Sequence, residues 1–164
     1  MKRILFLLFI TITFSGCEKD DICTDNTTPR LVLEFYDISN PSILKPVVNV
    51  LVTGEGQTAL GTYNGVSKIK LPLDITQDTT KYSLILNSTS LTGANEDLLQ
   101  FNYTRQNVFV SRACGYKTIF ELNATPNGVI RTDAATPDGF WIQDINILTT
   151  NIETENEIHI KIYF

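Results

Sequence analysis

The sequence predicts an all-β fold: a single antiparallel β-sandwich of the immunoglobulin-like, Greek-key type with about eight to ten strands. Three observations predict it. Apolar and polar residues alternate in several short runs, turn-forming residues separate the runs, and no stretch after residue 17 keeps the apolar spacing of a helix. A closed barrel is the alternative architecture.

The strands are expected where the alternation is clearest, because a strand with one buried face has a period of two. These runs lie at 31–36, 68–73, 82–87, 116–122 and 157–164. Further strands are expected near 47–53, 98–103, 108–110 and 142–148. In the last run Ile158, Ile160, Ile162 and Phe164 alternate with polar residues. We therefore expect His159 to face solvent.

Turn chemistry falls between the runs. The turn sequences are Asn40-Pro41, Gly54-Glu55-Gly56, Asn64-Gly65, Gly93-Ala94-Asn95, Asn127-Gly128 and Pro137-Asp138-Gly139. Asn64-Gly65 suits a type I′ hairpin, in which both central residues have positive φ.

Residues 1–16 have the pattern of a secretion signal. A basic start, Met1-Lys2-Arg3, precedes an apolar run from Ile4 to Phe14, and the small residues Ser15 and Gly16 follow. The run has eleven residues, whereas a helix that crosses a bilayer needs about 20. A transmembrane anchor is therefore disfavoured. We divide the chain into a signal at 1–16, a polar tether at 17–30 and a β-sandwich domain at 31–164.

The tetrapeptide that ends at Cys17 resembles the bacterial lipobox, in which the signal is cut before a cysteine that carries diacylglycerol. Phe14 stands where the motif usually has Leu. The resemblance implies that Cys17 is the lipidation site and that acyl chains hold the protein to a membrane.

Lys19, Asp20 and Asp21 follow the cysteine and resemble the surface-export signal of Bacteroidota lipoproteins. This likeness implies attachment to the outer membrane with the domain facing the cell exterior. Attachment at the periplasmic face is the alternative, since a short charged tether without an export function has the same kind of sequence.

The charge balance argues against nucleic acid as a partner. Without Lys2 and Arg3 the remaining chain has 11 basic and 18 acidic residues, a net charge of −7. No block of basic residues stands against this balance. The chain as a whole therefore has no electrostatic reason to bind nucleic acid or anionic lipid headgroups.

Two cysteines remain once Cys17 is assigned to the lipid. Cys23 and Cys114 form an even pair in an exported protein, which predicts a disulfide between them. Free thiols are the alternative.

No catalytic or metal-binding constellation is visible. His159 is the single histidine, so a zinc site built from several histidines is excluded. Asp133 and Asp138 flank a loop, and Asp20, Asp21 and Asp25 cluster in the tether, but neither group has EF-hand spacing. Paired carboxylates on different strands would not be visible in a sequence. We expect no cofactor.

Trp141 is the candidate ligand contact. It follows the turn Pro137-Asp138-Gly139, and an exposed tryptophan can stack on a sugar ring. A core position is the alternative and the more common role of a lone tryptophan in a sandwich.

The segments GCEKDDICT, PRLVLEFYD, SRACGYK and NEIHIKIYF together resemble an uncharacterised family of Bacteroidota lipoproteins of the flavobacterial type. The resemblance implies an outer-membrane location and an all-β domain, and it supplies no catalytic residues. It also suggests an outer-membrane β-barrel protein or another envelope protein as a partner, besides the membrane itself.

These observations favour a non-enzymatic module that binds or supports another component of the envelope. A glycan-binding lipoprotein would need Trp141 or its neighbours exposed in a patch. A carboxylate-dependent hydrolase would need two acidic side chains that converge in a cleft.

Overall fold

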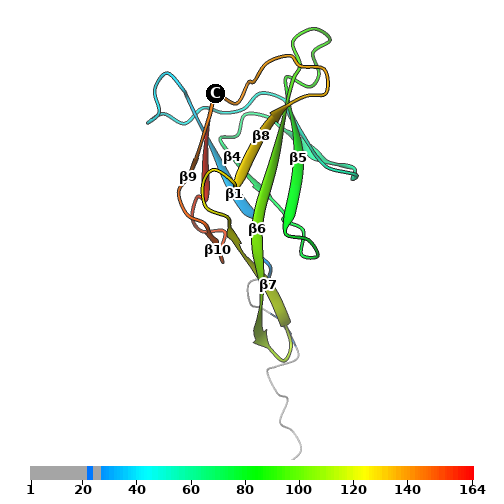
Figure 1. The fold of residues 1–164 in the computed structure, drawn as a ribbon, viewed down its shortest axis with the longest axis vertical. Helices are drawn as coiled ribbons and strands as arrows, with labels where there is room; N and C mark the ends of the chain where they lie inside the picture. Colours follow the sequence, from blue (N-terminus) through cyan, green and yellow to red (C-terminus); the bar gives the residue numbers. More distant parts are fainter. Residues whose placement is uncertain (1–21, 24–26) are drawn as a thin grey trace, which may run out of the picture.

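Two β-sheets pack face to face (Figure 1). The structure is a computed structural model that describes residues 22–23 and 27–164. None of these residues is helical, and they form eleven strands. The predicted all-β sandwich is therefore confirmed, with slightly more strands than expected.

The smaller sheet has the order β4-β1-β11-β9 and the larger one the order β10-β7-β6-β5-β2-β3, with β8 paired to β6. The smaller sheet contains β1 (Leu31–Tyr36), β4 (Lys68–Leu71), β9 (Asp144–Ile147) and β11 (Ile160–Tyr163). The larger sheet contains β2 (Val50–Gly54), β3 (Ala59–Tyr63), β5 (Thr79–Leu86), β6 (Asn95–Ser111), β7 (Gly115–Leu122), β8 (Val129–Asp133) and β10 (Asn151–Ile152).

The first and last strands lie side by side in the smaller sheet, and they are parallel. Leu33 is in register with Ile160, and Phe35 with Ile162. The sequence analysis expected antiparallel pairing throughout, so this pair is a correction. Alternation shows which face of a strand is buried but carries no information about its direction.

The core lies between the two sheets. The smaller sheet contributes fully buried side chains such as Leu33, Phe35 and Ile162, and the larger sheet contributes Leu84 and Phe101. Each of these residues stands at an alternate position of its strand, as the pattern predicted. Burial of such side chains stabilises the fold by roughly 1.5–3 kcal/mol each.

Strand β6 is the longest strand and connects the parts of the larger sheet. Its first half pairs with β5 and β8, and its second half pairs with β7. Asn102 binds both ends of the turn between β7 and β8: its N–H donates to Gly128 O, and its carbonyl accepts from Asn123 N. A Cβ atom at Gly128 would lie 2.1 Å from the Asn123 carbonyl oxygen, so only glycine fits there.

The Asn64-Gly65 turn is not a hairpin. It lies between β3 and β4, which belong to different sheets. Gly65 has a positive φ of 70°, but Asn64 does not. The predicted type I′ hairpin is therefore wrong. The Asn-Gly pair correctly marks a change of direction, but here the chain passes from one sheet to the other, and Gly65 N donates to Val47 O.

The parallel pair in the smaller sheet gives a direct test of the core. Ile162 is fully buried, so we expect Ile162→Ala to lower the free energy of unfolding by about 2–5 kcal/mol. Asn146→Ala, at an exposed position on neighbouring β9, should change it by less than about 0.5 kcal/mol. Urea denaturation measures both values. Equal stability of the two variants would contradict the assignment of Ile162 to the core.

Candidate functional site: the tethered β6–β7 hairpin

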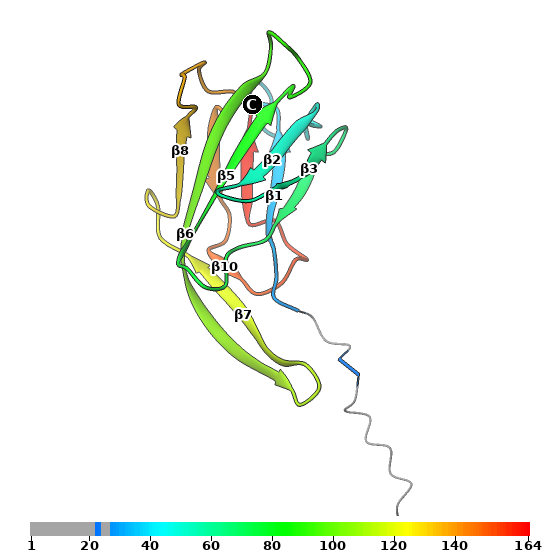
Figure 2. The ribbon, with the colours of Figure 1, turned by 90° about the vertical axis from the view of Figure 1, so that its right-hand side faces the viewer.

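The β6–β7 hairpin extends beyond the sandwich. From Tyr103 onward, β6 pairs with β7, and its pairing with β5 and β8 ends by Asn102. Figure 2 shows the two strands curving away from the body of the protein. The segment Thr104–Asn107 is polar and exposed on both faces, because no second sheet lies over it. The hairpin is therefore an arm with its own surface.

A tight turn closes the hairpin. The strands end at Ser111 and restart at Gly115, which has a positive φ of 69°. Ser111 Oγ accepts a hydrogen bond from Cys114 N at 3.1 Å. Glycine after a three-residue turn is the usual solution where the chain needs a left-handed residue.

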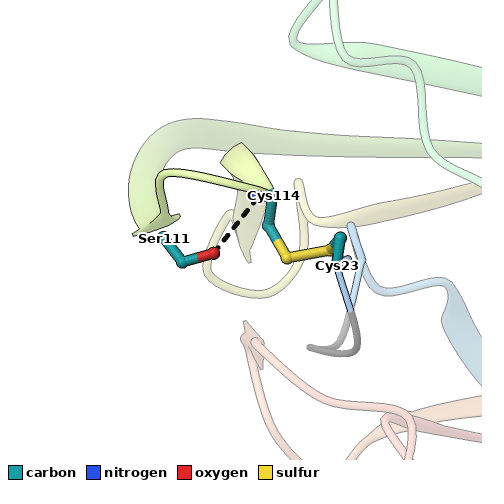
Figure 3. Close-up of a disulfide and its surroundings, with 3 residues drawn as sticks. All are labelled: Cys23, Ser111 and Cys114. Carbon is teal, nitrogen blue, oxygen red and sulfur yellow. Dashed lines mark hydrogen bonds between the residues drawn. A yellow bond between two sulfur atoms is a disulfide. The ribbon is translucent and has the colours of Figure 1, made fainter. Parts of the chain in front are cut away.

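A disulfide joins this turn to the N-terminal tether (Figure 3). Cys23 and Cys114 have their Cα atoms 4.8 Å apart and lie 91 positions apart in the sequence. The predicted disulfide is therefore confirmed. A cross-link over such a long loop stabilises a fold by about 4 kcal/mol in the chain-entropy account, by restricting the unfolded chain.

The tether makes further contacts with the body before β1 begins. Thr28 Oγ1 accepts a hydrogen bond from Thr118 N of β7 at 3.0 Å, and Pro29 is buried. Arg30 then binds Glu155 through its backbone N–H and its guanidinium. Lys70 of β4 donates to the same carboxylate at 2.9 Å.

These contacts hold the Glu155 carboxylate in its charged form. Its pKa is lowered to about 2, mainly by the hydrogen bond from the Arg30 side chain, against an opposing effect of burial, and Lys70 adds to the lowering. The end of the tether is thus fixed by an ion-pair network as well as by the disulfide.

The tip of the hairpin carries exposed aromatic rings. Phe109 and Tyr116 are opposite each other in the β6–β7 register, and their rings meet edge to face at 5.4 Å. Phe109 is 56% exposed and Tyr116 71% exposed. An aromatic pair that leaves this much surface in water is a candidate contact site.

The arm also has its own charge. From residue 98 to residue 120 the chain has Arg105, Arg112 and Lys117 and no acidic residue, although the whole chain has a net charge of −5. Arg105 pairs with Asp78 at 2.6 Å near the base of the arm. Arg112 lies in the turn, and Lys117 is next to Tyr116. The end of the arm is therefore basic and aromatic.

Several residues singled out by the sequence analysis lie outside the described residues. These are the signal at 1–16, Cys17, and the segment with Lys19, Asp20 and Asp21, together with Asp25. Cys23, which the disulfide joins to the hairpin turn, lies six positions after Cys17 in the sequence.

Trp141 lies in the core and not on a ligand-binding surface. It is 6% exposed, and its indole Nε1 donates to Leu84 O at 3.0 Å. Its ring packs against Phe35 and meets Phe164 edge to face at 5.4 Å. The exposed patch that a sugar contact at Trp141 requires is therefore missing, and the core alternative accounts for this residue.

His159 is buried, which corrects the expectation that it faces solvent. Strand β11 begins only at Ile160, so His159 lies before the regular alternation. Its backbone N–H donates to Val32 O, and Val32 N donates to its Nδ1 at 2.9 Å. His159 thus binds Val32, near the start of β1, through two hydrogen bonds. No sequence pattern indicates these bonds.

The His159 ring is held in its neutral form. Burial lowers its pKa, against an opposing effect of Glu157, the Thr154 carbonyl and Glu155. Since Nδ1 accepts a hydrogen bond, the ring proton is on Nε2, a buried atom that faces the Thr154 carbonyl. A histidine in this setting has a structural role in joining β1 to the final strand.

The buried carboxylate of Asp97 was not singled out by the sequence analysis. Asp97 is fully buried in β6 opposite Asp133, and its Oδ2 accepts from Ile142 N at 2.7 Å. Burial raises its pKa to about 6, against the hydrogen bond from Ile142 and the charge of Arg131. No periodicity could have found it, because Asp97 occupies an inward position that the pattern reserves for apolar residues.

Asp133 and Asp138, which the sequence analysis placed around a loop, do lie close together. Asp133 accepts backbone hydrogen bonds from Ala134 at 2.8 Å and from Gly139 at 3.1 Å. With Asp97 they hold the segment that crosses from β8 to β9. These carboxylates thus accept hydrogen bonds from backbone N–H groups, which is a structural role.

The described residues contain neither a metal-binding cluster nor a membrane-spanning helix. Within 22–23 and 27–164, no group of three or more His, Cys, Asp or Glu side chains could hold a metal ion. The same part of the chain contains no helix that is long and apolar enough to cross a bilayer.

Comparison with known proteins identifies a family. The model of a family of unknown function, DUF6452, matches residues 48–164, which is more than half of the chain. The chain belongs to the DUF6452 family. The search of curated proteins found no match, and the search of solved structures found none. The matched region includes the whole hairpin, and it assigns no activity.

The buried His159 predicts a pH dependence. Its folded-state pKa is lowered, while in the unfolded chain it titrates near its ordinary value of about 6.5. The unfolded chain therefore binds more protons below that pH, and stability should fall as the pH drops through about 6.5.

His159→Asn keeps an acceptor for Val32 N and removes the titration. The variant should therefore show a smaller loss of stability than the parent between about pH 7.5 and pH 5.5 in urea titrations. Taking the difference between the two proteins cancels the contribution of Asp97, which has the opposite sign. Identical pH profiles would show that His159 is not neutral and buried in the folded protein.

Proposed function

We propose that this protein is a non-enzymatic lipoprotein of the bacterial envelope, held to the outer membrane through Cys17, whose β-sandwich binds or supports another envelope component. The observation that carries the proposal is the disulfide between Cys23 and Cys114. It attaches the segment next to the expected lipid site directly to the folded domain.

The disulfide supports export. Disulfides form and persist in oxidising compartments such as the periplasm and the cell surface. The signal-like segment at 1–16 and the lipobox-like Cys17 point to the same compartment from independent residues. Lys19, Asp20 and Asp21 favour display on the cell exterior, with the periplasmic face as the alternative.

The surroundings of the reactive side chains support a binding or structural role. Nucleophilic catalysis needs an accessible base, and His159 is buried with Nδ1 committed to Val32 N. The carboxylates of Asp97 and Asp133 bind backbone N–H groups of the crossing segment. The glycan-binding alternative loses its contact at Trp141, which is buried.

The face of the larger sheet that points away from the core offers room for a protein partner. A shallow hollow of about 380 Å³ lies over β5, β6 and β8, with Leu98 and Ile130 in its lining. Such a sheet surface is typical of a module that binds other proteins. An outer-membrane β-barrel protein or another envelope protein is the partner we propose.

Replacement of Cys17 tests the anchor. Cys17→Ala should yield a protein without acyl label that fractionates with soluble envelope proteins, because the acyl chains supply the membrane affinity. Folding should be preserved, since the variant keeps Cys23 and Cys114 for the disulfide; the melting temperature is the control. A Cys17→Ala protein that still carries acyl label and sediments with membranes would contradict the proposal.

A further inference from the structure

We propose that the tip of the β6–β7 hairpin contacts the bilayer that carries the acyl chains, with Phe109 and Tyr116 in the interfacial layer and Arg112 and Lys117 on anionic lipid headgroups. The inference rests on the proposed lipidation of Cys17 and goes beyond it. The anchor requires only a tether, whereas this contact gives the domain a fixed orientation.

The first step is the length of the link. Cys23 is bonded to Cys114 in the hairpin turn and lies six positions after Cys17. Six residues span at most about 20 Å when fully extended. Since the Cα atoms of Cys23 and Cys114 are 4.8 Å apart, the turn can lie no farther than about 25 Å from the acylated residue, which itself lies at the bilayer surface.

The second step is that nothing within residues 22–23 and 27–164 covers the tip of the arm. Residues beyond Tyr103 pair with β7 and leave the sandwich (Figure 2). Within the described residues, the Phe109 ring has a ring contact with Tyr116, and both side chains stay more than half exposed. Two such rings at the far end of an arm are costly in water and favourable at a membrane surface.

The third step is the chemistry of the tip. Aromatic side chains are enriched at the level of lipid headgroups, where the ring is buried and the Tyr hydroxyl stays hydrated. Arg and Lys next to them meet the negative surface of phospholipids, at about 1 kcal/mol for each charge near the surface. Arg112 lies in the turn and Lys117 follows Tyr116 on β7, and the hairpin has no acidic residue between 98 and 120. The acidic residues nearest to Cys23 in the sequence are Asp20, Asp21 and Asp25.

The tip of the arm and the remainder of the molecule have opposite charge. Without the signal, the chain has 11 basic and 18 acidic residues, a net charge of −7, so an anionic membrane repels it on average. The basic arm is thus the part that such a surface attracts, and it is also the part that the disulfide holds near the lipid.

Fluorescence provides the test, because the protein has a single tryptophan and that residue is buried. Phe109→Trp places a reporter at the tip. The matched control is Phe140→Trp. In the parent protein Phe140 is 40% exposed. It follows Gly139, whose carbonyl accepts a hydrogen bond from Asn95 at the opposite end of β6. Both proteins are made in acylated form and reconstituted in vesicles of phosphatidylethanolamine, phosphatidylglycerol and a phosphatidylcholine brominated on its acyl chains.

We expect Phe109→Trp to show a blue-shifted emission and strong quenching by the brominated lipid. Phe140→Trp and the parent protein should show neither effect. Arg112→Glu combined with Lys117→Glu in the Phe109→Trp protein should reduce the quenching, since two attractive charges become repulsive.

The outcomes distinguish the two proposals. Mass spectrometry of the N-terminal peptide and flotation of the vesicles report whether the anchor exists. An acylated protein that floats with the vesicles but leaves Phe109→Trp unquenched overturns the tip contact and leaves the anchor intact. A protein without acyl chains overturns the proposed function itself. Equal quenching of the two reporters would also overturn the tip contact, because it would mean that the domain has no preferred orientation.

Discussion

The Cys23–Cys114 disulfide is the constraint on which the arrangement of this protein depends. Without it, the segment before Pro29 would be a flexible linker, and the domain could take any orientation relative to its N-terminus. With it, the chain is fixed to the hairpin turn, then to β7 through Thr28, and then to the body through Arg30 and Glu155. Three successive attachments thus hold Cys23, Thr28 and Arg30 to the folded domain.

These attachments differ in strength. The disulfide restricts the unfolded chain over 91 positions and is worth about 4 kcal/mol. The Arg30–Glu155 pair is partly exposed, and such pairs contribute about 1 kcal/mol or less. The direction of the arm thus depends first on the covalent bond, and the polar contacts align the tether along β7.

The same logic explains why the arm can project at all. An isolated two-stranded hairpin is at best marginally stable in water. Here β6 is also a central strand of the larger sheet, and the far end of the arm is joined to the tether by the disulfide. The hairpin is therefore held at both its base and its tip, which keeps Phe109 and Tyr116 exposed.

The sequence predicted the strands that have one buried face. Leu31, Leu33 and Phe35 alternate because β1 packs on the core with one side, and the same reason made β4, β5 and β7 visible. Strands β3 and β8 were missed because their residues are half-buried or exposed, so no alternation develops.

The arm could not be predicted in the same way. The polar segment Thr104–Asn107 looked like a connection between two short strands. It belongs to a single 17-residue strand, and it is the part at which that strand leaves the core. The cysteine pairing was predictable, since the sequence pattern indicates export and two cysteines leave one pairing once Cys17 is assigned to the lipid. The place where they meet was not, because it depends on the hairpin.

The positions of His159, Trp141 and Asp97 depend on contacts between residues far apart in the sequence. His159 bonds to Val32, Trp141 to Leu84 and Asp97 to Ile142. Each is a polar group whose partner is a backbone atom of another strand or loop. Backbone partners leave no trace in residue types, so sequence analysis assigned His159 to the surface and did not single out Asp97.

The most direct test of this account is peptide mapping of the protein purified from membranes without reduction. Trypsin should release residues 20–30, which contain Cys23, joined to residues 113–117, which contain Cys114, while the lipid stays on the peptide that begins at Cys17. The account predicts this linked pair in the acylated protein. Free thiols at both positions, or Cys23 bonded to another protein, would contradict it, because the hairpin would then have no fixed relation to the anchor.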